Sequence, residues 1–170
     1  MGRITAGDGR MDFWGKGKYE ELSADTGSAL YQALALNDLP AAWLLAKPLL
    51  ERANFERLPA ATVFNCGLCL YRLEEYEKAL DCLKRAELLL GTPPDLDAGE
   101  KELFLRAVQA DGQVFLRPLN PKAGRKLERY FLVRARWLSA LCLHRLGRRQ
   151  EAVPAVRFLA QYQILVNHIS

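Results

Sequence analysis

Two pairs of residues have the types and spacing used for metal binding or redox chemistry. Cys66 and Cys69 form a Cys-x-x-Cys motif, and Cys142 stands two residues before His144. A structural zinc site needs four ligands, and the sequence offers no second pair with suitable spacing. The redox motif follows a strand at a helix start, whereas Cys66 and Cys69 lie in the middle of an expected helix. Because free cysteine is among the most buried residue types, we expect core packing, with no metal or cofactor bound.

Nucleophilic catalysis and phosphate binding receive little support from the sequence. The chain has 2 histidines, His144 and His168, and few serines, so no nucleophile with its base stands out. Residues 15–18 read Gly-Lys-Gly-Lys, but they lack the spacing and the hydroxyl residue of a phosphate-binding loop. We therefore expect no catalytic residues and no enzymatic activity.

Basic residues concentrate in the last third of the chain. Residues 1–121 carry 14 basic and 18 acidic side chains, whereas residues 122–170 carry 10 basic and 2 acidic ones. The expected basic patch consists of Arg125, Arg129, Arg148 and Arg149. It could neutralise the phosphates of a nucleic acid, or meet an acidic partner or the acidic half of a second copy. No recognised nucleic-acid motif accompanies it, and the alternative is a solvated or ion-paired helix face.

Composition and cysteine use favour a soluble protein of a reducing compartment. The chain has 170 residues, of which 50% are hydrophobic and 26% charged, as in one ordinary globular domain. No apolar run approaches the roughly 20 residues needed to span a bilayer, and no signal-like segment precedes the cysteines. We therefore expect a cytoplasmic protein with no membrane partner, and a flexible lead-in over residues 1–22.

A repeated segment shows how the chain is organised. Residues 67–73 (GLCLYRL) recur as residues 140–146 (ALCLHRL), at an offset of 73 residues, and the register continues to Ala79 and Ala152. The same register placed 37 residues upstream aligns Leu36 with the end of the first segment, which indicates a weaker third copy. Each copy predicts two helices joined by a tight turn.

The clearest copy predicts two antiparallel helices around a turn at Glu74 and Glu75. Pro59 stands at the start of its first helix, where the missing N–H is harmless. Gly67 and Ala79 are small, and antiparallel helices approach closely only where a side chain is nearly absent. We therefore expect close contact between the two helices at these residues.

This pattern of small and large residues resembles the tetratricopeptide repeat, a helix-turn-helix unit of about 34 residues. The residues that carry the resemblance are Gly67, Leu70, Tyr76, Ala79, Leu83 and Ala86, followed by Pro93 and Pro94. The last unit keeps Trp137, Ala140, Leu143, Gly147 and Ala152. It departs from the pattern at Arg149, where the family prefers an aromatic residue, and at Pro154. In the first unit, Pro48 should kink or shorten the second helix.

The offset of 73 residues is about twice the family period and predicts another helical layer between the two clear copies. Asp97 and Glu100 have the spacing of a capping box ahead of one helix. An extended connection is expected over residues 114–118. Asn120 then caps a basic helix that could run to residue 146, about 25 residues or roughly 40 Å.

The resemblance implies a binding surface, because related repeat proteins hold a peptide or a partner helix on the concave face of their first helices. Side chains expected there combine aromatics with arginines, as in binding hot spots. They are Tyr31, Phe64, Leu68, Tyr71, Arg72, Arg134, Trp137, Leu141, His144 and Arg145. The alternatives are internal packing for Phe64 and Trp137 and plain solvation for Arg72 and Arg145. Gly27, Phe64 and Trp137 replace the polar residues with which some relatives clamp a carboxylate, so no such clamp is expected.

The sequence thus predicts an all-α fold, a right-handed α-solenoid of tetratricopeptide-like repeats with one inserted helix and a long basic helix. One domain is expected over residues 23–170, with repeats near 25–53, 60–92 and 134–166 and an inserted layer near 97–133. The expected function is that of a non-catalytic adaptor, scaffold or chaperone-like module whose groove binds a protein or peptide partner, for which an acidic peptide would suit the arginines. The alternative is binding of nucleic acid or an acidic partner, or homo-oligomerisation, through the basic helix at 122–149.

Overall fold

The computed structural model describes residues 13–51 and 57–166, and within these ranges all regular structure is helical. The elements are α1 (Phe13–Ala35), α2 (Leu39–Leu50), α3 (Ala60–Arg72), α4 (Tyr76–Leu90), α5 (Ala98–Ala110), the 3-10 turns η2 (Val114–Leu116) and η3 (Arg125–Leu127), α6 (Glu128–Arg145) and α7 (Arg149–Ala160). The expected all-α class is confirmed. None of these helices is long and apolar enough to cross a membrane.

Three pairs of helices, α1 with α2, α3 with α4 and α6 with α7, are joined by the same kind of turn. One turn residue in each has a positive φ: 59° at Asn37, 63° at Glu74 and 71° at Gly147. In each turn the next N–H bonds to a carbonyl five residues back, as from Glu75 to Leu70 at 3.0 Å, which closes the helix end. The turn residues are 37 and 73 residues apart, which are the offsets of the sequence repeat.

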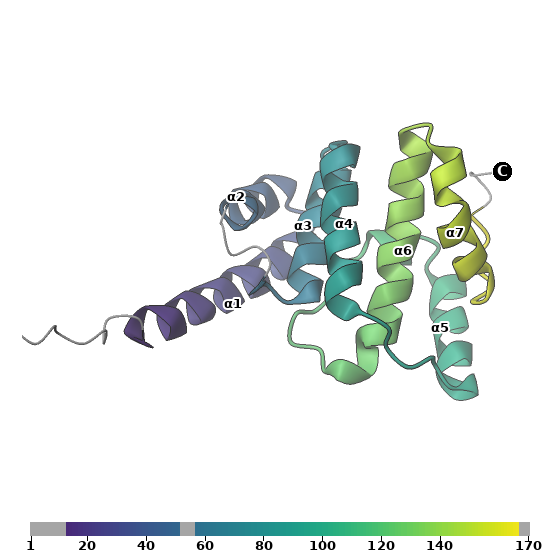
Figure 1. Ribbon diagram of the computed structural model, residues 1–170, viewed down its shortest axis with the longest axis horizontal. Coiled ribbons are helices and arrows are strands. Elements are labelled where there is room, and N and C mark those ends of the chain that lie inside the picture. The colour runs from purple at the N-terminus through teal and green to yellow at the C-terminus, as the bar shows by residue number, and fades with distance from the viewer. Residues whose placement is uncertain (1–12, 52–56, 167–170) are drawn as a thin grey trace, which may run out of the picture.

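Helix α3 is central, since it contacts α1, α2, α4 and α6, while α4 contacts α6 and α6 contacts α7 (Figure 1). Gly67 lets α3 approach α4 closely. A Cβ at this position would lie 3.2 Å from Cys82 Cβ and 3.3 Å from the carbonyl oxygen of Ala79. The expected close contact at Gly67 and Ala79 is confirmed.

Helix α1 begins at Phe13, so residues 13–22, which were expected to belong to a flexible lead-in, are helical. Residues 1–12 lie outside the described part of the chain. Once the C-terminal half of α1 is packed, each further turn of helix forms at little cost, and residues 20–22 (Glu-Glu-Leu) are good helix formers. The N-terminal half of α1 projects beyond the other helices (Figure 1).

The inserted layer contains one α-helix and the two 3-10 turns. Helix α5 starts with the expected capping box, in which Asp97 accepts a hydrogen bond from the Glu100 N–H at 2.8 Å. The Glu100 carboxylate in turn accepts from the Asp97 N–H at 2.9 Å. The connection at 114–118 differs from the extended form expected, because its first three residues make η2.

The long basic helix expected over residues 120–146 is shorter in the structure. Helix α6 has 18 residues and begins at Glu128, directly after η3. Gly124 is extended, with φ −70° and ψ 170°, and glycine loses more backbone entropy in a helix than any other residue type. The helix therefore does not reach back through this point, and Arg125 lies outside the helix that holds Arg129.

Two prolines lie inside helices. Pro48 lies inside α2, two residues before the end of this helix at Leu50. Pro154 removes one backbone donor from α7, yet this helix continues to Ala160.

The core has two parts. The larger lies among α1 to α4 and α6 and includes the four cysteines, all buried and free. The smaller lies where α5, α6 and α7 meet, around Phe104 and Trp137. Desolvation raises the pKa of Cys69 to about 11 and those of Cys82 and Cys142 to about 12, so these thiols stay protonated at neutral pH. The expected core packing of the cysteines is confirmed.

Candidate functional site

The ten residues expected to line a groove divide into a buried group and an accessible group. The buried residues are Phe64, Leu68, Arg134 and Trp137, with exposed fractions of 1%, 0%, 1% and 7%. The residues that keep some exposure are Tyr31, Tyr71, Arg72, Leu141, His144 and Arg145. The expectation of an open groove surface is therefore wrong for the first four residues. Phe64 and Trp137 instead pack inside the protein, as the alternative proposed.

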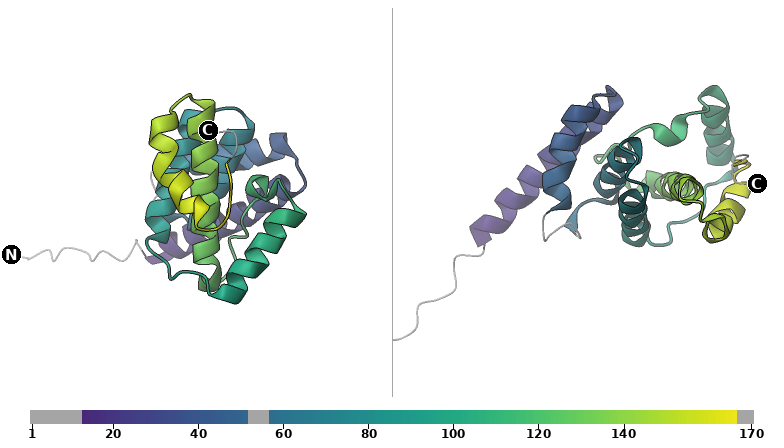
Figure 2. Two further views of the ribbon diagram at one scale, coloured as in Figure 1. Left: turned by 90° about the vertical axis from the view of Figure 1, so that its right-hand side faces the viewer. Right: turned by 90° about the horizontal axis from the view of Figure 1, so that it is seen from above.

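Residues 114–119, called here the connecting segment, explain this burial. The chain after α5 lies on the side of α3 and α6 that faces away from α4 and α7 (Figure 2, right). The ring of Phe115 lies 5.2 Å from the ring of Trp137, and Leu119, 3% exposed, joins the core cluster of Phe64. Part of the inserted layer therefore occupies the place expected for a partner.

Asn65 of α3 holds the far end of the connecting segment. Its Nδ2 donates to the carbonyl of Leu119 at 2.8 Å, and its Oδ1 accepts from the N–H of the same residue at 2.8 Å. Asn65 is fully buried, so both halves of its amide require a partner. One side chain thus pairs with both backbone groups of one residue.

Two arginines donate hydrogen bonds to backbone carbonyls in the middle of the connecting segment. Arg72 donates to Leu116 O at 2.5 Å, and also to Leu34 O at 3.0 Å, so it links the segment to α3 and α1. Arg134 of α6 donates to Arg117 O and, at 2.7 Å, to the hydroxyl of Tyr130. Arg72 is therefore not a merely solvated arginine.

The burial of Arg134 has an electrostatic consequence. Its guanidinium lies 5.7 Å from the ring of Phe64 and 5.5 Å from that of Tyr130, so it is enclosed by aromatic faces. Desolvation lowers the pKa of Arg134, although arginine stays charged at any physiological pH. The carbonyl of Arg117 is thus one of the few groups that compensate a buried charge.

These hydrogen bonds fix the direction of the connecting segment. Leu116 is bound by the last residue of α3, and Leu119 by Asn65, seven residues earlier in that helix. Seven helical residues span roughly 10 Å, and three extended residues reach about as far. Arg117 has φ −84° and ψ 142°. After η2 the segment therefore runs extended and antiparallel to α3.

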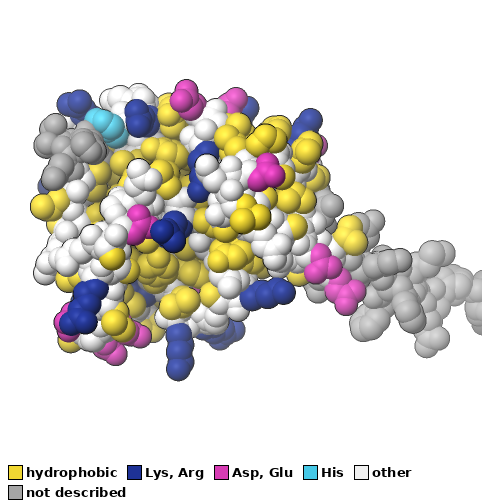
Figure 3. All heavy atoms as spheres, turned by 180° about the vertical axis from the view of Figure 1, so that it is seen from behind, with side chains coloured by type: hydrophobic (Ala, Val, Ile, Leu, Met, Phe, Trp, Pro, Cys, Tyr) yellow, Lys and Arg dark blue, Asp and Glu magenta, His cyan; other side chains and the backbone are white. Residues whose placement is uncertain are grey.

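The C-terminal ends of α3 and α6 stay accessible beyond the segment. This open end consists of Tyr71, Leu141, His144 and Arg145. A side-chain hydrogen bond from Arg145 to Tyr71 raises the pKa of Arg145, and desolvation raises the pKa of Tyr71. Among the described residues, His144 Nδ1 has no hydrogen-bond partner. Viewed from behind, apolar side chains gather across the middle of the molecule, with lysines and arginines along the lower edge (Figure 3).

The expected basic patch of Arg125, Arg129, Arg148 and Arg149 is not one surface. The first two precede or begin α6 and the last two follow it, so a helix of roughly 27 Å separates them. Arg148 pairs with Glu77 at 2.9 Å and with Glu151 at 2.7 Å. Arg125 and Arg149 are exposed. The four arginines therefore do not form one contiguous patch.

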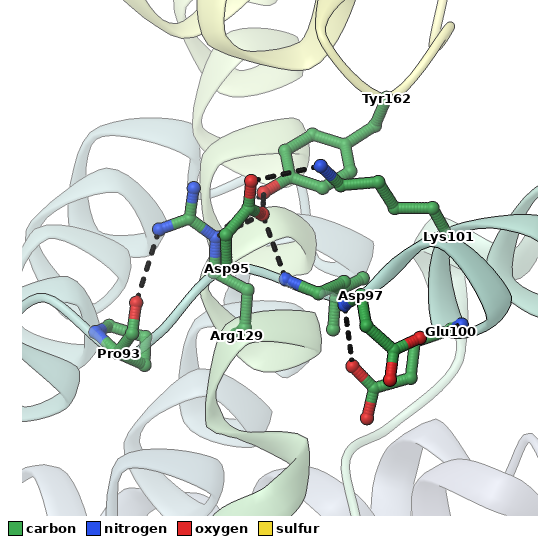
Figure 4. Close-up of polar contacts among 8 residues, drawn as sticks. Pro93, Asp95, Asp97, Glu100, Lys101, Arg129 and Tyr162 are labelled. Atoms are coloured by element: carbon green, nitrogen blue, oxygen red, sulfur yellow. Dashed lines mark hydrogen bonds and ion pairs between the residues drawn. The ribbon is translucent and has the colours of Figure 1, made fainter.

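Arg129 belongs to a cluster that fixes the connection between α4 and α5 (Figure 4). Asp95 accepts from the Tyr162 hydroxyl at 2.7 Å and from Lys101 Nζ at 2.9 Å. Arg129 donates to the Tyr162 oxygen at 2.7 Å and to Pro93 O at 3.3 Å. The pKa of Asp95 is lowered to about 2, mostly by the hydrogen bond from Tyr162 and next by the hydrogen bond from Lys101. The cluster ties α5, α6 and the end of α7 together.

Sequence reasoning missed Asn65 and Leu119. Asn65 stands in a run of ten buried residues, 61–70, and one amide in such a run signals a specific partner. It is also next to Phe64, the position considered for a clamp. Leu119 lies between a proline and an asparagine, where no periodic pattern marks a buried residue.

Comparison with known proteins adds no family. No family model, curated protein or solved structure matches this chain. Among the described residues no group of three or more potential metal ligands occurs. The function therefore has to be inferred from the α3 and α6 face itself.

Proposed function

We propose that this chain is a non-catalytic protein-interaction module that binds an extended segment of a partner protein on the face of α3 and α6. The observation that carries the proposal is the pairing of Asn65 with both backbone groups of Leu119. Side chains that bind backbone groups suit an extended chain of many sequences, which is how peptide-binding surfaces gain affinity. Apolar contacts such as Phe115 on Trp137 then give specificity.

The architecture in this proposal is a short right-handed solenoid of three tetratricopeptide-like hairpins. Its support is the same left-handed turn residue at Asn37, Glu74 and Gly147, at the offsets of the sequence repeat. In such a solenoid the first helices, here α1, α3 and α6, line one side, and this is the side on which the connecting segment lies.

The partner first contacts the open end. Tyr71 and Leu141 supply apolar area, and Arg145 supplies a cation for a partner carboxylate. Aromatic and arginine side chains of this kind dominate the energy of protein interfaces. An acidic residue next to an apolar one is the partner chemistry that fits this end.

Selection from a library of random 12-residue peptides tests the proposal. Immobilised wild-type protein serves as bait, and each enriched peptide is measured by fluorescence polarisation against wild type, the Tyr71→Ser/Arg145→Ser variant and a control. The control, Gln109→Ser, changes an exposed residue of α5. We expect micromolar binders that lose at least tenfold in affinity on the double variant alone. No enrichment, or binders insensitive to the double variant, would contradict the proposal.

A second candidate surface is the loop before α6. Lys122, Arg125 and Lys126 are exposed, and among the described residues their charged side chains make no ion pair or hydrogen bond. Leu127, 45% exposed, extends the same loop. An anionic partner, such as an acidic protein surface, fits three cations that are not neutralised internally. This loop replaces the long basic helix as the alternative site.

A further inference from the structure

The connecting segment is held as a bound peptide would be held. The carbonyls of Leu116, Arg117 and Leu119 and the N–H of Leu119 are paired with side chains of α3 and α6. Most backbone groups of an ordinary surface connection are paired in local turns or with water. Here three side chains from two helices reach out to an extended stretch of backbone.

Apart from the Asp95 cluster at the start of α5, the chain on both sides of this segment has few buried residues. Upstream, Phe104 is the buried residue of α5, and Leu103 of that helix is 66% exposed. Downstream, residues 120–127 are exposed or half-buried. Gly112 and Gly124 flank the segment, and a Cβ at either would meet nothing within 4 Å. Few apolar contacts and open flanks are features of regions that open before the rest of a protein unfolds.

The polar side chains that the segment covers determine what could take its place. Asn65 and Arg134 are buried under it, and an apolar replacement without hydrogen-bonding groups would leave the amide and the charge unpaired. A replacement must therefore offer extended backbone carbonyls and one N–H. It must also bring apolar side chains where Phe115 and Leu119 sit, whereas the exposed side chain of Arg117 imposes no requirement.

We propose that residues 114–119 occupy the partner's own site, and that the partner replaces them with an extended peptide apolar at the positions of Phe115, Leu116 and Leu119. This inference rests on the proposed function and names its ligand. The connecting segment then acts as an internal competitor. Because a segment tethered at both ends has an effective concentration on the order of millimolar, only a matching ligand displaces it.

A labelled peptide copy of the chain itself provides the probe. Fluorescein is attached to a peptide of residues 111–123 (DGQVFLRPLNPKA), and polarisation is measured with wild type and with the Phe115→Ser/Leu119→Ser variant. The variant weakens the internal competitor and leaves the α3 and α6 side chains in place. We expect the variant to bind the peptide at least tenfold more tightly than wild type does.

Two controls show where the peptide binds. Adding Asn65→Leu to the double variant removes the amide that holds the backbone, so we expect at least a tenfold loss of peptide affinity. A peptide with serine in place of its phenylalanine and last leucine should not compete. A folded double variant that binds no better than wild type, or binding that Asn65→Leu leaves unchanged, overturns the inference.

Hydrogen exchange tests the inference without any substitution. The N–H of Leu119 is protected by Asn65 Oδ1, and segment opening exposes it while α3 and α4 stay folded. We expect this amide to exchange at least 100-fold faster than buried amides within α3 and α4, such as those of Leu70 and Leu83. Exchange at the rate of the core amides would show that the segment leaves only on global unfolding and would overturn the inference.

The outcomes separate this inference from the proposed function. If library peptides bind the open end while Leu119 exchanges only with the core, the chain is an interaction module that binds through the open end alone, and the internal competitor is refuted. If Leu119 opens early and the copied peptide binds the double variant, the internal competitor stands even where no library peptide binds the wild type.

Discussion

Replacement of Asn65 by leucine gives a direct measure of how firmly the connecting segment is held. Leucine has the same number and branching of side-chain heavy atoms as asparagine and removes both hydrogen bonds to Leu119, each 2.8 Å long. Each bond contributes about 1 kcal/mol net, and a buried group left without a partner costs about 1–3 kcal/mol. We therefore expect Asn65→Leu to lower the free energy of unfolding by about 3 kcal/mol.

Urea unfolding followed by circular dichroism at 222 nm measures this loss. For a chain of this length, 3 kcal/mol corresponds to a fall in Tm of roughly 6–12 °C. The matched control is Gln109→Leu, the same kind of change at an exposed position of α5, which should alter the free energy of unfolding by less than about 0.5 kcal/mol. A loss below about 1 kcal/mol for Asn65→Leu would refute the reasoning, because the backbone of Leu119 would then have to be satisfied in another way.

Three further predictions concern packing, pH and charge. Gly67→Ala places a Cβ 3.2 Å from both Cys82 Cβ and Leu83 Cγ, so we expect urea unfolding to show a loss of about 1–3 kcal/mol, whereas Gly112→Ala, in open space, should change little. The pKa of Asp95 is lowered to about 2 in the folded state, so its stabilisation is present above the ordinary carboxyl pKa near 4 and is lost as the pH falls through about 2. Urea midpoints at pH 7, 4 and 2 should thus fall more steeply for wild type than for Asp95→Asn, and parallel curves would contradict this. For the loop before α6, Arg125→Glu/Lys126→Glu should weaken binding to immobilised polyglutamate at least tenfold, while Arg148→Glu, at an arginine already paired with Glu77 and Glu151, should weaken it less.

The sequence predicted those parts of the fold that depend on local pattern. The hairpin turn at Glu74, the capping box at Asp97 and the close helix approach at Gly67 each follow from a few neighbouring residues, and each is present in the structure. The prediction of a long basic helix was wrong for a related reason, because one glycine, Gly124, outweighs the helix-forming residues around it.

The site was harder to predict, because its geometry depends on contacts between distant parts of the chain. Asn65 and Leu119 are 54 residues apart, and no periodicity connects them. The groove prediction placed Phe64 and Trp137 on the exposed face of their helices, and in the structure the connecting segment packs against both residues. It could not show that the inserted layer returns to cover that face, since helical pattern describes which side a residue points to and says nothing of what packs there.

Whether the connecting segment opens as a unit can be decided from the additivity of two substitutions. Asn65→Leu acts on α3, and Phe115→Ser acts against Trp137 of α6. If the segment is a fixed part of the core, two changes without a shared contact should add within about 0.5 kcal/mol. If it opens as a unit, the first change already favours the open form, and the second has little left to remove.

We expect the segment to open as a unit. The free energy of unfolding, measured in urea, should then fall in the double variant by at least about 1 kcal/mol less than the sum of the two single losses. The control pair is Asn65→Leu with Leu159→Ala, a fully buried residue of α7 that lies outside the connecting segment, and this pair should be additive. Additivity in both pairs would mean that the segment unfolds only with the whole protein. If only the first pair loses less than the sum of its single losses, the α3 and α6 face can be uncovered while the three hairpins stay folded. This uncovering is the condition for any partner to reach Asn65.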